Sequence, residues 1–203
     1  MDNINTIKLR GILKEIEHSH NIDGVSFDRA KLICKRSNGQ EDTINLSFKS
    51  FSNRHKENSE VTLSGNVRSY SYKTDTNSNR VTIYVFTYFD DLEEELEGDN
   101  IVNITGRICK MNELRKTRSG KHNVHFIVAN NLVSNDSSKR LNSYIPCIAW
   151  GSIAKQLAEL PVNTKIGLQG ELHSREHTKS HEDGSVEIRV AHELMITSFE
   201  VFE

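Results

Sequence analysis

The residues that decide the fold read Tyr144-Ile-Pro-Cys-Ile-Ala-Trp150, an alternating stretch typical of a β-strand. Successive side chains of a strand point to opposite faces, so Tyr144, Ile148 and Trp150 share one face and the small apolar residues between them share the other. The small side chains suit a packed core, which places Tyr144 and Trp150 on the outer face about 20 Å apart. Widely spaced aromatics on a sheet can hold single-stranded nucleic acid, because every base has a face that can stack. The alternative is that Trp150 covers the core beside Gly151.

The sequence around this strand contains an internal repeat. Ile7-Lys-Leu-Arg-Gly11 is matched by Val102-Asn-Ile-Thr-Gly106, and Val61-Thr-Leu-Ser-Gly65 is matched by Ile166-Gly-Leu-Gln-Gly170. Each half therefore offers five alternating apolar runs that are separated by polar turns. The expected strands lie near 5–14, 25–35, 42–48, 60–70 and 80–89 in the first half, and near 101–110, 122–131, 143–150, 164–175 and 185–199 in the second.

Glycines inside the first and fourth expected strands of each half predict where the sheet bends. An interior glycine weakens a strand and usually marks a bulge or a sharp bend. Five strands bent in this way are typical of a small closed barrel such as the OB-fold. A helix is expected after the third strand of the second half, with Ser152 as its N-cap and Pro161 at its end. We therefore predict an all-β protein with two tandem five-stranded OB-fold barrels, the second with a short α-helix between its third and fourth strands.

The net charge of −2 is an average over unlike segments. Residues 90–99 contain seven acidic residues and no basic residue. Residues 1–89 contain 13 basic and 10 acidic residues, and residues 100–203 contain 13 basic and 11 acidic residues. The acidic segment thus predicts a linker, residues 90–99, between an N-terminal domain of residues 1–89 and a C-terminal domain of residues 100–203. Both domains are mildly basic, which permits contact with phosphates.

The cysteines and the apolar pattern exclude several classes of protein. Cys34, Cys109 and Cys147 have no CxxC spacing and lie in apolar runs, so we expect buried thiols rather than disulfides or a zinc site. No apolar stretch is long enough to span a membrane, and Met1-Asp-Asn-Ile lacks the layout of a signal peptide. These features predict a cytoplasmic protein.

Catalysis finds little support in the sequence. His173, His177 and His181 recur every four residues, but they fall in an expected strand end and hairpin loop, where they do not converge on a metal ion. No phosphate-binding glycine loop, nucleophile elbow or paired-carboxylate motif is present. We therefore predict a binding protein without cofactor or metal, and not an enzyme.

Several motifs of the second half have the order found in one protein family. They are Gly106-Arg107, then Asn112 to Lys121, Val124 to Ala129, Tyr144 to Gly151, and Ile166 to Arg175. On these motifs the second half resembles the bacterial single-stranded DNA-binding protein family, and the whole chain is similar to members with two tandem OB domains. The resemblance implies a non-catalytic protein that coats single-stranded DNA during replication, recombination or repair. In that family aromatics stack on bases while Lys and Arg follow the backbone.

The resemblance implies a DNA-binding surface, and the chain's departures from the family pattern at Asn130 to Leu132 and at His177 predict that both halves contribute to it. Two stacking positions of the family fall on Tyr144 and Trp150, and Tyr70 and Tyr72 supply aromatics in the first half. The basic residues of the second half's first strand and hairpin are expected to contact phosphates, although such charges are also ordinary on a solvated hairpin. The candidate DNA-binding residues are Tyr144, Trp150, Arg107, Lys110, Arg115, Lys116, Arg118, Lys121, Arg175, Arg68, Tyr70 and Tyr72.

The resemblance also implies partners. Single-stranded DNA is the first, and the family's four-barrel arrangement would require a homodimer giving four OB-folds. Replication or recombination proteins are further expected partners, and no membrane contact is expected. A second function stays open, in which the chain is an OB-fold accessory module of a replisome or primosome and acts mainly through protein–protein contacts.

Overall fold

The structure is a computed structural model that describes residues 3–50, 56–73, 79–87, 99–133, 140–180 and 184–202. Apart from Asp99, the predicted acidic linker lies outside the described residues. The described elements are strands with one short helix, which confirms the predicted all-β class. They are β1 (Asn5–Ile22), β2 (Val25–Lys35), β3 (Glu41–Lys49), β4 (Glu60–Lys73), β5 (Asn79–Thr87), β6 (Asn100–Met111), β7 (Arg115–Lys116), β8 (His122–Val133), β9 (Arg140–Trp150), α1 (Gly151–Ala158), β10 (Lys165–Ser180) and β11 (Val186–Phe202).

Two hairpins extend further than the sequence predicted. β1 continues to Ile22 and β10 to Ser180, and both stay paired with the next strand along the chain to the tip. The last residues of β1 and β10 are exposed on both faces. Alternation therefore disappears from the sequence there, although the backbone hydrogen bonds continue.

The predicted N-cap of the helix is wrong. The N-cap residue of α1 is Trp150, which makes no side-chain capping bond, and Ser152 lies inside the first turn. Gly151 has a φ of 64°, a left-handed conformation that glycine adopts without steric cost. The chain can thus turn from β9 directly into α1, whose Ala154 and Leu157 are buried. No helix in the described part of the chain is long and apolar enough to cross a membrane.

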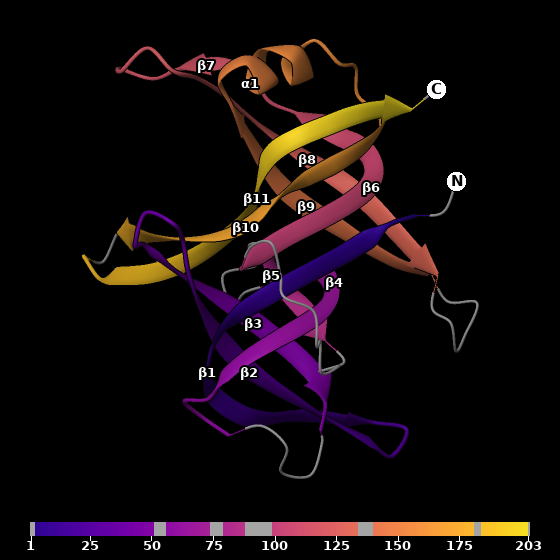
Figure 1. Ribbon diagram of the computed structural model, residues 1–203, viewed down its shortest axis with the longest axis vertical. Coiled ribbons are helices and arrows are strands. Elements are labelled where there is room, and N and C mark those ends of the chain that lie inside the picture. Colours follow the sequence, from indigo (N-terminus) through magenta and orange to yellow (C-terminus); the bar gives the residue numbers. More distant parts are fainter. Residues whose placement is uncertain are drawn as a thin grey trace.

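The strand pairings close into two rings that share one seam (Figure 1). In the first half β1 pairs with β2 and β4, while β3 and β5 complete the circuit. In the second half β6 pairs with β8 and β10, β9 and β11 complete the circuit, and β7 adds to the edge of β8. Antiparallel pairing of β1 with β6 joins the two rings into one sheet.

The seam relates the two halves as a two-fold axis relates the subunits of a dimer. Ile7 of β1 lies opposite Val102 of β6, which is its own counterpart in the repeat. The residues on either side are paired reciprocally: Thr6 lies opposite Asn103, the counterpart of Lys8, and Lys8 lies opposite Ile101, the counterpart of Thr6. Such a contact, in which the same surface is used twice, is the isologous type found in symmetric dimers.

Two side-chain amides repeat this symmetry, the buried one of Asn5 and the partly buried one of Asn100. The Asn5 side chain donates to the carbonyl oxygen of Val67 and accepts from its N–H, both at 2.8 Å. The Asn100 side chain contacts the carbonyl oxygen and N–H of Leu172 in the same way, at 2.8 and 3.0 Å. Each amide takes the place of a backbone partner, so a slip of β1 against β4, or of β6 against β10, would leave these polar groups unpaired.

The interior glycines mark close approaches between strands. A Cβ on Gly106 would lie 2.5 Å from the carbonyl oxygen of Ala129, and the other three would also collide with a backbone oxygen of a facing strand. A register shift accompanies only Gly170 among them in the described pairings, so the predicted bulge is confirmed there. The glycines in question are Gly11, Gly65, Gly106 and Gly170.

Candidate nucleic-acid interface

The outer face of β9 carries two exposed aromatic rings. The side chains of Ile145, Cys147 and Ala149 are buried, whereas Tyr144 is 49% exposed and Trp150 is 40% exposed. The predicted alternation is confirmed for Tyr144 and Trp150, whereas Ile148, which was predicted on the same outer face, is buried. Because the Trp150 side chain is substantially exposed, its ring is accessible to a ligand.

A basic side chain lies in register with Trp150. On β8, Asn123 lies opposite Trp150 of β9 and also opposite Arg115 of β7. Residues in register across neighbouring strands point to the same face, and strands are about 4.8 Å apart, which places Arg115 about 10 Å from Trp150 on that face. Lys116, Arg118 and Lys121 on the same hairpin are exposed. A base stacked on Trp150 would therefore have cations within reach of its phosphates.

The remaining predicted cations are distributed more widely. Lys110 of β6 lies opposite Ile127, which lies opposite Pro146 on the outer face of β9. The Arg107 guanidinium donates to the carbonyl oxygen of Asn163 in the connection after α1, at 2.8 Å. The structure thus brings Lys110 to the β9 face and directs Arg107 toward the α1–β10 connection. Arg175 is exposed on the extended part of β10, and Arg68 is partly exposed on β4.

A hollow beside Trp150 carries acidic as well as aromatic groups. Glu171 and Glu193 line it, and each lies close to a histidine ring. His173 Nε2 lies 2.8 Å from a carboxylate oxygen of Glu171, and His125 Nδ1 lies 3.6 Å from one of Glu193. These two carboxylates and two histidines, here called the acidic wall, could not be predicted from the sequence. They come from three strands that only the β9–β11 pairing brings together. The carboxylates make this side of Trp150 unfavourable for phosphates.

The histidine series does not form a metal site in the described residues. His173 is paired with Glu171, His177 is exposed on β10, and His181 lies outside the described residues. The described part of the chain contains no group of three or more His, Cys, Asp or Glu side chains that could hold a metal ion.

The predicted tyrosines of β4 stack on each other. The Tyr70 and Tyr72 ring centroids lie 5.9 Å apart at an interplanar angle of 14°. The Tyr144 backbone N–H donates to the Ser69 hydroxyl at 2.8 Å, so β4 does meet β9. Alternation places Tyr70 on the other face of β4 from Ser69, so the structure brings the strands together without joining the tyrosines to the β9 aromatics.

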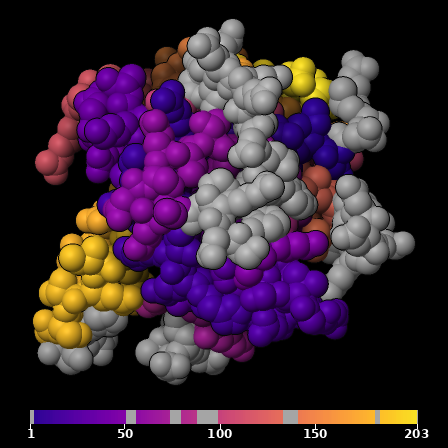
Figure 2. Space-filling view, turned by 60° about the horizontal axis from the view of Figure 1, so that its bottom comes forward, coloured from indigo at the N-terminus to yellow at the C-terminus, as the bar shows by residue number. Residues whose placement is uncertain are grey.

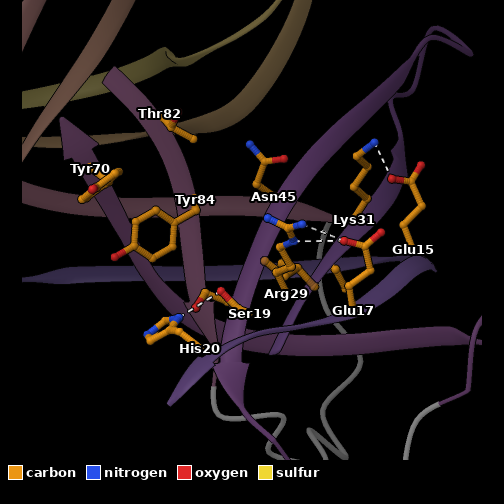
Figure 3. Close-up of a pocket in the computed structure, with 13 residues that line it drawn as sticks. Glu15, Glu17, Ser19, His20, Arg29, Lys31, Asn45, Tyr70, Thr82 and Tyr84 are labelled. Atoms are coloured by element: carbon orange, nitrogen blue, oxygen red, sulfur yellow. Dashed lines mark hydrogen bonds and ion pairs between the residues drawn. The ribbon is translucent and has the colours of Figure 1, made fainter. Parts of the chain in front are cut away.

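Tyr70 lines a groove of the first half, between the β1–β2 and β4–β5 hairpins (Figure 3). Tyr84 and His20 line the same groove and were missed by sequence reasoning. The alternation of β5 is the signal that could have identified Tyr84, because its neighbours Ile83 and Val85 are buried. The groove's cations are paired with acids: Arg29 contacts Glu17 at 2.8 Å and Lys31 contacts Glu15 at 2.5 Å.

A buried ionic contact, the Asp42 contact, joins the first half to β10. The Asp42 side chain is fully buried and accepts two hydrogen bonds from Arg36, at 2.5 and 2.7 Å, and one from the Ser174 N–H at 2.5 Å. Burial opposes the ionisation of Asp42, but these donors outweigh it and hold the pKa of the carboxyl below its usual value. Thr43 N–H donates to the Ser174 hydroxyl at 2.9 Å. In Figure 2 the β10–β11 hairpin, in orange and yellow, lies beside the first half.

His192 makes the Asp42 contact sensitive to acid. Its Nε2 lies 2.7 Å from the Thr43 carbonyl oxygen, and burial lowers the pKa of the ring despite that bond and the nearby Asp42 charge. The unfolded chain then binds a proton more readily, so the stability from His192 is complete above about pH 6.5 and is lost as the pH falls below it.

We expect the free energy of unfolding, measured with urea, to fall between pH 7 and pH 5 more steeply in the wild type than in His192→Gln. Equal slopes would contradict this assignment. The Asp42 contribution should persist until about pH 4, because its folded pKa is depressed.

Comparison with known proteins supports one family. No curated protein matches the sequence significantly. Two solved structures of the single-stranded DNA-binding protein from Thermus aquaticus resemble the whole chain: the wild type with a TM-score of 0.73 and a deletion mutant with a TM-score of 0.72. Both are 16% identical and cover 100% of this chain, which covers 95% and 96% of theirs, so the likeness is one of fold. The sequence profile of the single-strand binding protein family matches residues 99–201, and the chain therefore belongs to that family.

Proposed function

We propose that this protein binds single-stranded DNA without sequence preference and protects it during replication, recombination or repair. The observation that carries the proposal is the exposed Trp150 ring in register with Arg115 of the β7–β8 hairpin. A base would stack on Trp150 while Arg115, Lys116, Arg118 and Lys121 contact phosphates. Stacking is tolerant of sequence because every base offers a π-face. Binding and protection need no catalysis or cofactor, and we expect the protein to act in the cytoplasm.

We infer that each ring of strands is an OB barrel, with domains at residues 1–89 and 100–203 joined by the acidic linker at residues 90–99. The closure of both circuits and the repeated glycines support this division. In an OB barrel the second and third strands, with the first and last hairpins, form the binding face. The groove with Tyr70 and Tyr84 occupies that position in the first half, so Tyr70, Tyr72 and Arg68 are candidates for a second DNA contact. Two chains would give a homodimer with four barrels.

One observation favours the alternative of an accessory module that acts through protein contacts. Val186, Ile188 and Val190 alternate along β11 and are all exposed, forming an apolar stripe on the β10–β11 hairpin. Stripes of this kind are suited to protein partners, including replication or recombination proteins. This function would not require Trp150.

A titration of tryptophan fluorescence tests the proposal. Trp150 is the only tryptophan, so stacking predicts that oligo-dT quenches the emission of the wild-type protein. Added salt should weaken binding, with a slope of about 0.7 in log affinity per log salt for each phosphate contact. Duplex DNA is the control and should have little effect. Absence of quenching and of binding at low salt would exclude the DNA function and favour the accessory module.

A further inference from the structure

We propose that the β2–β3 turn of the first half forms the second wall of the Trp150 site and contacts the edge of the base stacked there. The turn comprises Ser37, Asn38 and Gly39. This inference rests on the proposed function, and it adds a contact from the other half of the chain to the same site. It differs from the sequence expectation, in which Tyr70 and Tyr72 supplied the contribution of the first half.

The hollow beside Trp150 is built from both halves. One side consists of residues of the second half, among them Ile148 and Met195, and the other side consists of Arg36, Ser37 and Asn38. Figure 1 shows the β2–β3 turn beside the β10–β11 hairpin, where Arg36 contacts Ser174 of β10. A nucleotide stacked on Trp150 would therefore lie between the indole ring and this turn.

The turn is held in one conformation. Gly39 N–H donates to the Arg36 carbonyl oxygen at 2.9 Å, and Gly39 has a φ of 84°. Asn38 Oδ1 accepts from the Gln40 N–H at 3.0 Å, and its Nδ2 donates to Gln40 Oε1 at 3.1 Å. An amide has two N–H groups and two lone pairs, so Asn38 keeps one donor and one acceptor for a ligand. Ser37 is exposed beside it.

Arg36 positions the turn and is not a phosphate ligand. Its guanidinium makes four hydrogen bonds, two to Asp42, one to the Ser174 carbonyl oxygen and one to Gln40 Oε1. Five N–H donors are available to an arginine, so little remains for DNA. The contacts with Asp42 and Ser174 fix the turn against β10, which belongs to the same half as Trp150.

The charges around the hollow decide which part of a nucleotide faces the turn. Glu171 and Glu193 line the hollow and repel phosphates, whereas Arg115 lies on the other flank of Trp150. A bound strand therefore places its backbone along the β7–β8 hairpin and its base toward the turn. The Asn38 amide, with one donor and one acceptor, can meet the edge of any base and is compatible with sequence-independent binding.

The test uses two variants: a double variant that carries both Ser37→Ala and Asn38→Ala, and the single variant Arg115→Ala. The affinity of each for labelled oligo-dT is measured by fluorescence anisotropy over a range of salt concentrations. Loss of one or two hydrogen bonds should weaken binding about three- to tenfold without changing the salt slope. Arg115→Ala should weaken binding and also lower the slope by about 0.7. Asn103→Ala is the matched control, because Asn103 is exposed on β6 at the seam and lines neither the hollow nor the groove, and it should bind as the wild type does.

The outcomes separate this inference from the proposed function. If the wild type binds oligo-dT and the affinity of the double variant stays within twofold of the wild-type affinity, the inference is overturned and the proposed function is left intact. A double variant that lowers the salt slope as Arg115→Ala does would show phosphate contact and overturn the assignment to a base edge. Amide chemical shifts of Asn38 and Gly39 in the wild type should also move on addition of oligo-dT. Failure of the wild type to bind at all would overturn the proposed function itself.

Discussion

Trp150→Ala should weaken oligo-dT binding by roughly 5- to 150-fold, because a stacked base contributes about 1–3 kcal/mol. The side chain is 40% exposed, and α1 receives no capping bond from it, so the fold does not depend on the ring. Anisotropy of a labelled oligonucleotide measures the loss, since the variant has no tryptophan to quench. The unfolding temperature should stay close to that of the wild type.

Two further variants control this result. Trp150→Phe keeps a stacking face and should recover most of the affinity, while Tyr144→Ala should weaken binding without unfolding the protein. A Trp150→Ala protein that binds oligo-dT as tightly as the wild type would rule out stacking at this position. One that melts at a much lower temperature would show instead that the ring belongs to the core.

Asp42→Ala should lower the free energy of unfolding by about 3 kcal/mol, because it removes one partner of a buried ion pair. The variant leaves the Arg36 guanidinium and the Ser174 N–H without their acceptor. Arg36 is 22% exposed, so water relieves part of the cost and the effect lies toward the lower end for such pairs. Urea unfolding measures the change, and acidic pH should reduce the difference between the two proteins.

Glu187→Gln provides the matched control for this prediction. Glu187 also bridges the halves, through Arg80 at 3.1 Å, but both side chains are about one-third exposed. Exposed pairs contribute at most about 1 kcal/mol, so this variant should unfold close to the wild type. Equal losses in the two variants would show that burial of Asp42 does not set its contribution.

The elements that could be predicted from the sequence are those whose signal is local. Alternation identified ten strands, and it placed Trp150 and Tyr144 on the outer face of β9 with Cys147 inside. The ends of β1 and β10 were missed because their residues are exposed on both faces and show no alternation of apolar and polar side chains. The helix start was missed because Gly151, and not a capping side chain, allows the chain to turn.

The parts of the site that could not be predicted depend on contacts between distant segments. The position of Arg115 beside Trp150 follows from the register of three strands. The pairing of β9 with β11 brings the acidic wall next to Trp150, and the Asp42 contact brings the β2–β3 turn there. Asp42 and Ser174 lie in the expected strands 42–48 and 164–175, but nothing in the sequence of these strands indicates that the two residues meet.

The reciprocal pairing of β1 with β6 has a consequence for the direction in which DNA can run. A single strand has polarity, so the two proposed binding faces, one on each half and related by a two-fold axis, would favour opposite directions of travel when seen from one viewpoint. A strand that follows both halves of the chain in the same chemical sense must therefore reverse its course between them. The seam at Ile7 and Val102 thus suits a looped path around the protein rather than a straight track across it.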